Sequence, residues 1–137
     1  MKTTPLIDDW TRGPGPAAVF AEFLARDEFR IQRCRACGSH LFYPRLACTR
    51  CGDTALEWVL PSGRGTVHAV SIVNRSAEKG GPYNVVLVDL AEGPRMMSRV
   101  EGVANAQVLI GMEVHARVAR ASDGHCVVFD AVPGAPA

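Results

Sequence analysis

The sequence lacks the features that mark several large classes of protein. Its 137 residues contain no run of about 18 apolar residues, the length that a membrane-spanning helix requires. Fifteen basic and fourteen acidic side chains leave a net charge of +1, whereas nucleic-acid-binding modules usually carry a clear basic excess. Residues 1–10 have no long apolar stretch and do not resemble a secretory signal. We therefore expect a cytoplasmic protein without a membrane segment.

Motifs that organise catalysis or nucleotide binding are also missing. The sequence has no Gly-x-Ser-x-Gly, no Walker pattern, and no Gly-x-Gly-x-x-Gly after a strand. No histidine falls in a recognisable pattern with a serine or a carboxylate; the four are His40, His68, His115 and His125. We therefore predict no catalytic residue in this chain, and whether it has an activity of its own stays open.

Cysteine, by contrast, is concentrated in one short window. Four of the five cysteines form two Cys-x2-Cys pairs separated by ten residues: Cys34, Cys37, Cys48 and Cys51. In a reducing compartment this spacing indicates a metal site, because two tight turns can face each other and supply four thiolates in a tetrahedron. Gly38 and Gly52 follow the two pairs, and we expect both to adopt a positive φ and to aim backbone N–H groups at the sulfurs.

Four thiolates leave no open coordination position, so this site is predicted to be structural and not catalytic. Zinc is the expected metal, and an iron site of the rubredoxin type remains the alternative. The segment has a small predicted core of its own: Leu41, Phe42, Leu46, Leu56 and Trp58. Without the metal it is therefore expected to fold poorly. Cys126 stands apart in an apolar run and is predicted to be a small buried residue.

The rest of the chain reads as a mainly β protein with one helix. Apolar residues at helical spacing predict an amphipathic helix over residues 17–26, which packs on its own domain or docks on a partner. We divide the chain into an N-terminal segment with this helix (1–27), a rubredoxin-like zinc ribbon (28–58) and an OB-fold (59–133). Short ribbon strands are expected near residues 30–33 and 56–59.

The C-terminal part predicts a five-stranded barrel. Apolar alternation and turn signals place the strands at 66–75, 84–91, 95–100, 112–118 and 125–132. A helical turn within 103–109, between the third and fourth strands, favours the OB-fold, and an SH3-type barrel is the alternative. The Gly-rich loop 78–83 between the first two strands is expected to be flexible and suited to docking or to solvent exposure.

The motifs together resemble a known family. The sequence reads Arg-Cys-Arg-Ala-Cys-Gly at 33–38, Tyr-Pro-Arg-x-x-Cys-x-x-Cys-Gly at 43–52, Ser-Gly-Arg-Gly-Thr-Val at 62–67, and a run from 80 to 95 that ends in Glu-Gly-Pro-Arg. Over residues 17–132 this resembles the zinc-ribbon/OB-fold accessory family long catalogued as domain-of-unknown-function family thirty-five. The combination of the cysteine pairs with the later motifs is much more specific than the cysteine pairs alone.

The resemblance implies a non-catalytic accessory subunit of an acyl-CoA-processing enzyme. Members of the family accompany thiolases, condensing enzymes, thiolase-like retro-aldolases and enoyl-CoA hydratases, and the larger partner carries most of the catalytic residues. The resemblance therefore implies a heteromeric complex with a thiolase-fold or other acyl-CoA enzyme, in which this chain stabilises the partner and helps to form its acyl-CoA site. A stand-alone acyl-CoA-binding protein and a single-strand nucleic-acid-binding protein are the alternatives.

An arginine-rich ribbon suits such a ligand. Residues 30–52 contain five arginines and no carboxylate. Guanidinium groups pair well with phosphates, so the candidate contacts to the phosphates of coenzyme A are Arg33, Arg35, Arg45 and Arg50. These arginines could equally offset the negative charge of a four-thiolate metal site.

Overall fold

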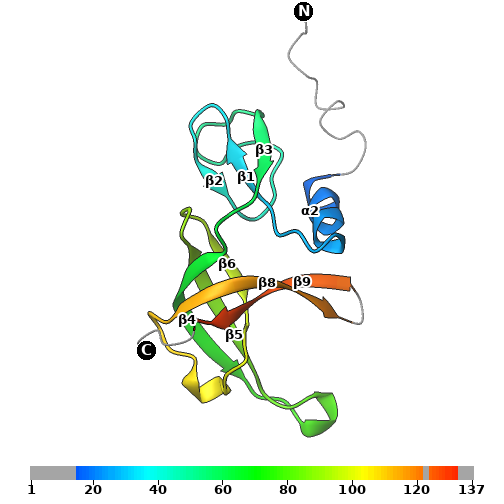
Figure 1. The fold of residues 1–137 in the computed structure, drawn as a ribbon, viewed down its shortest axis with the longest axis vertical. Coiled ribbons are helices and arrows are strands. Elements are labelled where there is room, and N and C mark those ends of the chain that lie inside the picture. Colours follow the sequence, from blue (N-terminus) through cyan, green and yellow to red (C-terminus); the bar gives the residue numbers. More distant parts are fainter. Residues whose placement is uncertain (1–14, 122–123, 133–137) are drawn as a thin grey trace, which may run out of the picture.

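The computed structural model describes residues 15–121 and 124–132 and arranges them as one α-helix, two sheets and two 3-10 turns (Figure 1). In chain order the elements are α2 (Pro16–Ala25), β1 (Ile31–Cys34), β2 (His40–Leu41), β3 (Leu56–Val59), β4 (Arg64–Val73), η1 (Ala77–Lys79), β5 (Tyr83–Leu90), β6 (Arg95–Ser98), β7 (Val100–Glu101), η2 (Asn105–Gln107), β8 (Glu113–Ala121) and β9 (Gly124–Ala131). Within these residues no helix is long and apolar enough to cross a membrane.

Helix α2 starts and ends where the sequence favours it. Gly15 has an extended backbone, and Pro16 occupies the first turn, where its missing N–H costs no hydrogen bond. Asp27, with a φ of 61°, turns the chain just after the helix. The ring of Phe20 packs edge-on against that of Phe42, and Leu24 is only 4% exposed and lies in the barrel core. The helix therefore packs on its own chain.

The ribbon is a three-stranded antiparallel sheet in the order β2-β1-β3. Its central strand β1 pairs with β3 from Ile31↔Val59 to Cys34↔Leu56. This pairing brings residues more than 20 positions apart in the sequence into one sheet. The cysteine-bearing turns lie at one end of this sheet, and the barrel begins directly after β3 (Figure 1).

The second sheet has the order β6-β5-β4-β8-β9-β7 and closes into a barrel. Strands β6 and β7 are consecutive pieces of one strand, interrupted at Arg99, and β7 pairs in parallel with β9. The five strands thus close in the Greek-key arrangement of the OB-fold predicted from the sequence, with the third strand split in two. The turn η2 lies within the predicted 103–109 segment.

One apolar core runs through the barrel and reaches the other two parts of the chain. Its innermost side chains come from four barrel strands and are at most 1% exposed: Val67, Val86, Val88, Val114 and Phe129. Leu24 of α2 and Ile31 of β1 belong to the same cluster. Helix, ribbon and barrel are therefore held together by shared apolar packing, which is the main stabilising term in folded proteins.

The structure corrects the predicted ribbon core and adds contacts to the loop 78–83. Leu46 is 45% exposed and Trp58 packs on the ring of Phe23 in α2, so the ribbon core is smaller than predicted and consists of Cys34, Leu41 and Cys48 with Leu56. The loop 78–83, which was expected to be flexible, is contacted by Arg75. The guanidinium of Arg75 donates a hydrogen bond to the Gly81 carbonyl (2.6 Å) and lies 4.5 Å above the ring of Tyr83.

Candidate metal centre and neighbouring cavities

The four cysteines of the two pairs come together at one end of the ribbon. Their sulfur atoms all lie within 4.8 Å of one another. The Sγ atoms of Cys34 and Cys51 are 3.5 Å apart, and those of Cys37 and Cys48 are 3.7 Å apart. A tetrahedral zinc with Zn–S bonds near 2.3 Å would separate its sulfurs by about 3.8 Å. The observed spacing therefore fits a four-thiolate zinc site.

The pKa values of these thiols also indicate that the site needs a bound cation. Hydrogen bonds from Ser39 lower the pKa of Cys37 to about 6, which favours the thiolate form that binds metals. The Asp53 amide lowers the pKa of Cys51, but the adjacent Cys34 thiol and burial outweigh it and raise this pKa to about 12. Four crowded sulfurs cannot all ionise unless a positive charge lies between them.

The glycines of the two turns adopt the predicted backbone, and the turns direct N–H groups at the sulfurs. Gly38 and Gly52 have φ values of 81° and 79°, a region that favours glycine. Their own N–H groups donate to the carbonyl oxygens of Cys34 and Cys48. As expected, other backbone N–H groups of the turns point at sulfur: those of Ser39 and Asp53 interact with Cys37 and Cys51, and that of Arg50 donates to Cys48 at 3.3 Å.

A buried glutamine that the sequence analysis did not single out supports the metal-binding turns. Gln32 on β1 is 4% exposed, and its side-chain amide donates to the Arg45 carbonyl (2.8 Å) and accepts from the Arg45 N–H (2.6 Å). This double hydrogen bond fixes the loop that leads to the second cysteine pair. The only sequence feature that could have indicated this role is the presence of a polar residue, Gln32, within a predicted strand of the ribbon.

The structure does not bring the four candidate arginines into one cavity. Arg33 forms an ion pair with Glu57 of β3, with an N–O distance of 3.0 Å. Arg45 lines a cavity beside α2, and Arg50 lines a different one, which the ribbon shares with the turn at Glu92. Arg35 is exposed. Glu57 lies just outside the arginine-rich segment, so a count of charges within that segment missed it.

The Ser-Gly-Arg-Gly motif at 62–65 and the Glu-Gly-Pro-Arg motif at 92–95 meet at the end of the barrel that faces the ribbon. The Ser62 N–H donates to the carboxylate of Glu92 (2.8 Å), and the Ala91 N–H donates to the Arg64 carbonyl (2.9 Å). A Cβ added to Gly65 would lie 2.5 Å from a Val88 methyl group, so only glycine allows the two strands to approach this closely. These motifs therefore form the end of the barrel.

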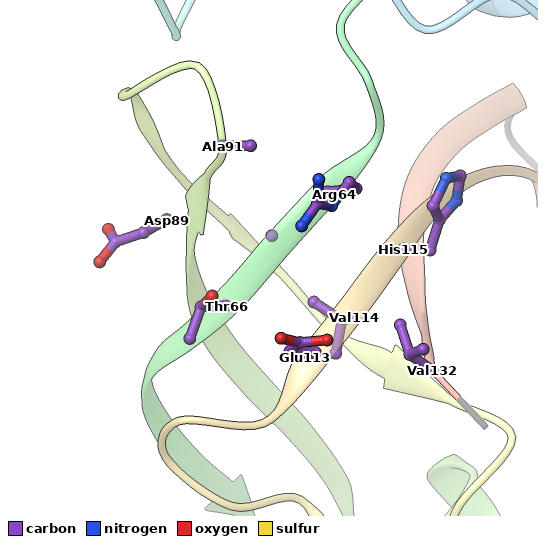
Figure 2. Close-up of a pocket in the computed structure, with 9 residues that line it drawn as sticks. Arg64, Thr66, Asp89, Ala91, Glu113, Val114, His115 and Val132 are labelled. Atoms are coloured by element: carbon purple, nitrogen blue, oxygen red, sulfur yellow. The ribbon is translucent and has the colours of Figure 1, made fainter. Parts of the chain in front are cut away.

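A shallow cavity of about 300 Å³ lies on the outer face of the barrel between β4 and β8 (Figure 2). Arg64 and His115 extend from the two neighbouring strands, whereas Asp89 points away from them (Figure 2). The pKa of Asp89 is lowered mainly by its hydrogen bond from Arg95. Nδ1 of His115 lies 3.0 Å from the Ala116 carbonyl. Among the described residues, no hydroxyl in this cavity is hydrogen-bonded to a histidine or a carboxylate, as activation of a nucleophile requires.

Comparison with known proteins finds a family model for the ribbon and another for the barrel. Residues 21–57 match the family model described as "ChsH2, rubredoxin-like zinc ribbon domain", and residues 58–119 match "ChsH2, C-terminal OB-fold domain". A DUF35 domain-containing scaffold protein of Pyrococcus furiosus is 32% identical over 93 residues, which cover 65% of this chain and 68% of that protein. The chain belongs to the DUF35 family.

Other relatives of this DUF35 chain are named as enzyme subunits. The 3-oxo-4,17-pregnadiene-20-carboxyl-CoA hydratase alpha subunit of Mycobacterium tuberculosis is 36% identical over 105 residues, which cover 72% of this chain and 32% of that subunit. A solved structure described as "Ltp2-ChsH2(DUF35) aldolase" superposes with a TM-score of 0.76 at 27% identity, over 88% of this chain and 97% of the matched chain. The DUF35 chain spans 27% to 62% of the length of several curated relatives that it matches.

Proposed function

We propose that this chain is a non-catalytic, zinc-stabilised accessory subunit of an acyl-CoA-processing enzyme, which it stabilises and whose acyl-CoA site it helps to form. The match to the chain of the "Ltp2-ChsH2(DUF35) aldolase" structure carries the proposal, because it extends over 97% of that chain. The partner is a thiolase or a thiolase-like aldolase, and the CoA hydratase relative supports the wider class of acyl-CoA enzymes.

The geometry of the chain supports an accessory role. A metal held by Cys34, Cys37, Cys48 and Cys51 would have no free coordination position for water or substrate. The residues that line the cavity between β4 and β8 form no nucleophile–base pair within the described structure. The chemistry of the complex then belongs to the larger subunit.

We propose that the metal is zinc and that it stabilises the ribbon. The core of the ribbon consists of two buried cysteines and Leu41, packed against Leu56. Burial of so few apolar groups cannot offset the conformational entropy of the ribbon segment, so metal binding must supply part of the folding free energy.

The arginines of the ribbon remain candidates for the phosphates of coenzyme A. Arg35, Arg45 and Arg50 have exposed side chains, whereas Arg33 is already paired with Glu57. Charge-assisted hydrogen bonds from a guanidinium to a phosphate are among the strong ones. Replacement of the three exposed arginines by glutamine should therefore raise the Kd of the complex for coenzyme A, and Arg33→Gln should change it less.

Native affinity capture tests the proposal. The tagged full-length chain is recovered from its own cells under gentle conditions, and its stoichiometric partner is identified by mass spectrometry. We expect a thiolase-fold or related acyl-CoA enzyme. A chain that elutes as a monomer with no such partner contradicts the proposal. Micromolar acyl-CoA affinity of that monomer would then favour a stand-alone binder, and salt-dependent oligonucleotide binding would favour a nucleic-acid-binding protein.

A further inference from the structure

An apolar groove follows the seam between β6 and β9, where helix, ribbon and barrel meet. It consists of two cavities of about 450 Å³ and 330 Å³ that share Met97, Cys126 and Val127. Helix α2 and the ribbon loop at Tyr43 line the first cavity, and β5 borders the second. Figure 1 shows α2 and β6 close to the first part of β9. Cys126, predicted to be a small buried residue, is instead half-buried and lines this groove.

The groove exists because two strand edges separate along the seam. Strand β9 pairs with β8 along its whole length, but on its other side it pairs only at Phe129 and Asp130, with β7. In the part of the chain that the structure describes, no strand covers Gly124–Val128 on that side or the outer edge of β6. At this end of the seam the Ser98 hydroxyl donates a hydrogen bond to the Val127 carbonyl (2.8 Å).

The backbone of β9 presents hydrogen-bonding groups to this groove. The Phe129 N–H donates to the Arg99 carbonyl, and the Val127 carbonyl accepts from Ser98, so both residues direct their backbone groups towards β6. Because the direction of these groups alternates along a strand, the N–H groups of Val127 and His125 face the same way. Open strand edges of this kind are templates for the addition of another strand.

The open edge of β9 distinguishes a peptide from an apolar ligand. An acyl chain would leave the backbone N–H groups of this edge unpaired, whereas a peptide backbone can pair with them. Apart from His125 the lining carries one charged side chain, Arg99, which is already paired with Glu101 at 2.7 Å. The groove therefore complements an uncharged peptide.

We propose that this groove binds an extended, apolar and uncharged peptide segment of the partner enzyme, which adds as a strand to the edge of β9 at His125 and Val127. This inference rests on the accessory role proposed above. The side chains of the segment would cover Met97 and Tyr43, which are 57% and 47% exposed. Alternating side chains give such strand additions their specificity, and the main-chain hydrogen bonds give them affinity.

The experiment measures the affinity of two charged variants of the full-length chain for the partner enzyme. The partner is the one that is captured with the wild-type chain. Met97→Glu introduces a charge into the groove. Ile110→Glu is the control, because Ile110 is 67% exposed and lies in the loop before β8, outside the groove lining. We expect Met97→Glu to raise the Kd at least about tenfold and Ile110→Glu to change it less than about twofold. Circular dichroism checks that both variants fold.

Amide hydrogen exchange then identifies the mode of binding. We expect the His125 and Val127 amides to exchange at least about tenfold more slowly in the complex. Unchanged affinity of Met97→Glu, or unchanged exchange at both amides, overturns the groove proposal and leaves the accessory role intact. If the chain alone forms a dimer and Met97→Glu dissociates that dimer, a second copy of the chain occupies the groove. This result would also overturn the groove proposal. Failure to capture any acyl-CoA enzyme overturns both proposals.

Discussion

The Tyr43 hydroxyl on the ribbon accepts a hydrogen bond from the backbone N–H of Met97 on the barrel, at 3.2 Å. The paired hydrogen bonds between Gln32 and Arg45 hold the loop that carries Tyr43. This contact fixes the ribbon against β6 at a position 54 residues away in sequence. Tyr43 and Met97 also line the groove along the seam between β6 and β9.

Loss of this contact should weaken the junction between ribbon and barrel. We expect Tyr43→Phe to lower the free energy of unfolding by about 0.5–1 kcal/mol, because water replaces part of a half-exposed hydrogen bond. Urea denaturation followed by circular dichroism, with zinc present, measures the change. Tyr83→Phe is the control, since its hydroxyl has no hydrogen bond to the described residues. Equal effects of the two substitutions would contradict a role for the contact.

A methyl group at Gly65 should destabilise the barrel. The added Cβ would lie 2.5 Å from a Val88 methyl group and 3.2 Å from the Asp89 carbonyl, both on the paired strand β5. We expect Gly65→Ala to lower the free energy of unfolding by about 1–3 kcal/mol, the usual cost of overpacking a core. At Gly15 a Cβ meets no atom within 4 Å, so Gly15→Ala should cost clearly less. The same denaturation experiment compares them, and an equally mild effect at Gly65 would argue against the close strand approach.

The sequence predicted the parts of the structure that depend on local pattern. The cysteine spacing identified the four sulfurs that come together, and the apolar periodicity placed α2 within one residue of each end. Glycine after each cysteine pair correctly indicated a positive φ. These features depend on neighbours within a few residues, which is the range over which sequence patterns constrain the backbone.

Contacts between distant segments could not be predicted in the same way. The Arg33–Glu57 ion pair depends on the pairing of β1 with β3, and the contact of Trp58 with Phe23 depends on the position of α2. The break at Arg99 follows from the closure of the barrel, where β7 must leave β5 to pair with β9. No local pattern at these positions specifies a partner 20 or more residues away.

An ion-pair cluster on the barrel should make stability depend on pH. Arg117 donates hydrogen bonds to Asp130 and Glu101 and lowers the pKa of both carboxyl groups. A carboxyl group whose pKa is lower in the folded state stabilises the fold at neutral pH, and this contribution is lost as the pH falls through the folded value. The wild type should therefore lose free energy of unfolding as the pH falls below about 4.5, the usual range of these groups.

Removal of the Arg117 charge should make the free energy of unfolding depend less on pH. We expect Arg117→Gln to be less stable than the wild type at pH 7 and to lose less stability between about pH 5 and pH 3. Because all three side chains are more than 30% exposed, the difference should be modest. Denaturation curves at several pH values measure it, with Arg120→Gln as a control on the same strand. Parallel pH profiles of wild type and Arg117→Gln would show that the cluster does not contribute.

The metal site makes a separate prediction about folding. Cys34 is fully buried at the centre of the ribbon core. We expect Cys34→Ser to lose the metal and to unfold the ribbon, whereas Cys126→Ser keeps about one equivalent of zinc per chain. Elemental analysis and amide hydrogen exchange across the ribbon measure the two effects. Full zinc content in Cys34→Ser, or an ordered ribbon without metal, contradicts the structural role of the site.

The most direct test of the accessory role is a comparison of turnover by the chain alone, the captured partner alone, and the reconstituted complex, with acyl-CoA substrates of the partner. We predict no turnover by the chain alone, and a complex that is more active or more stable than the partner alone. Turnover by the chain alone at the rate of the complex, or a partner whose activity and stability do not change when the chain is added, would contradict the account.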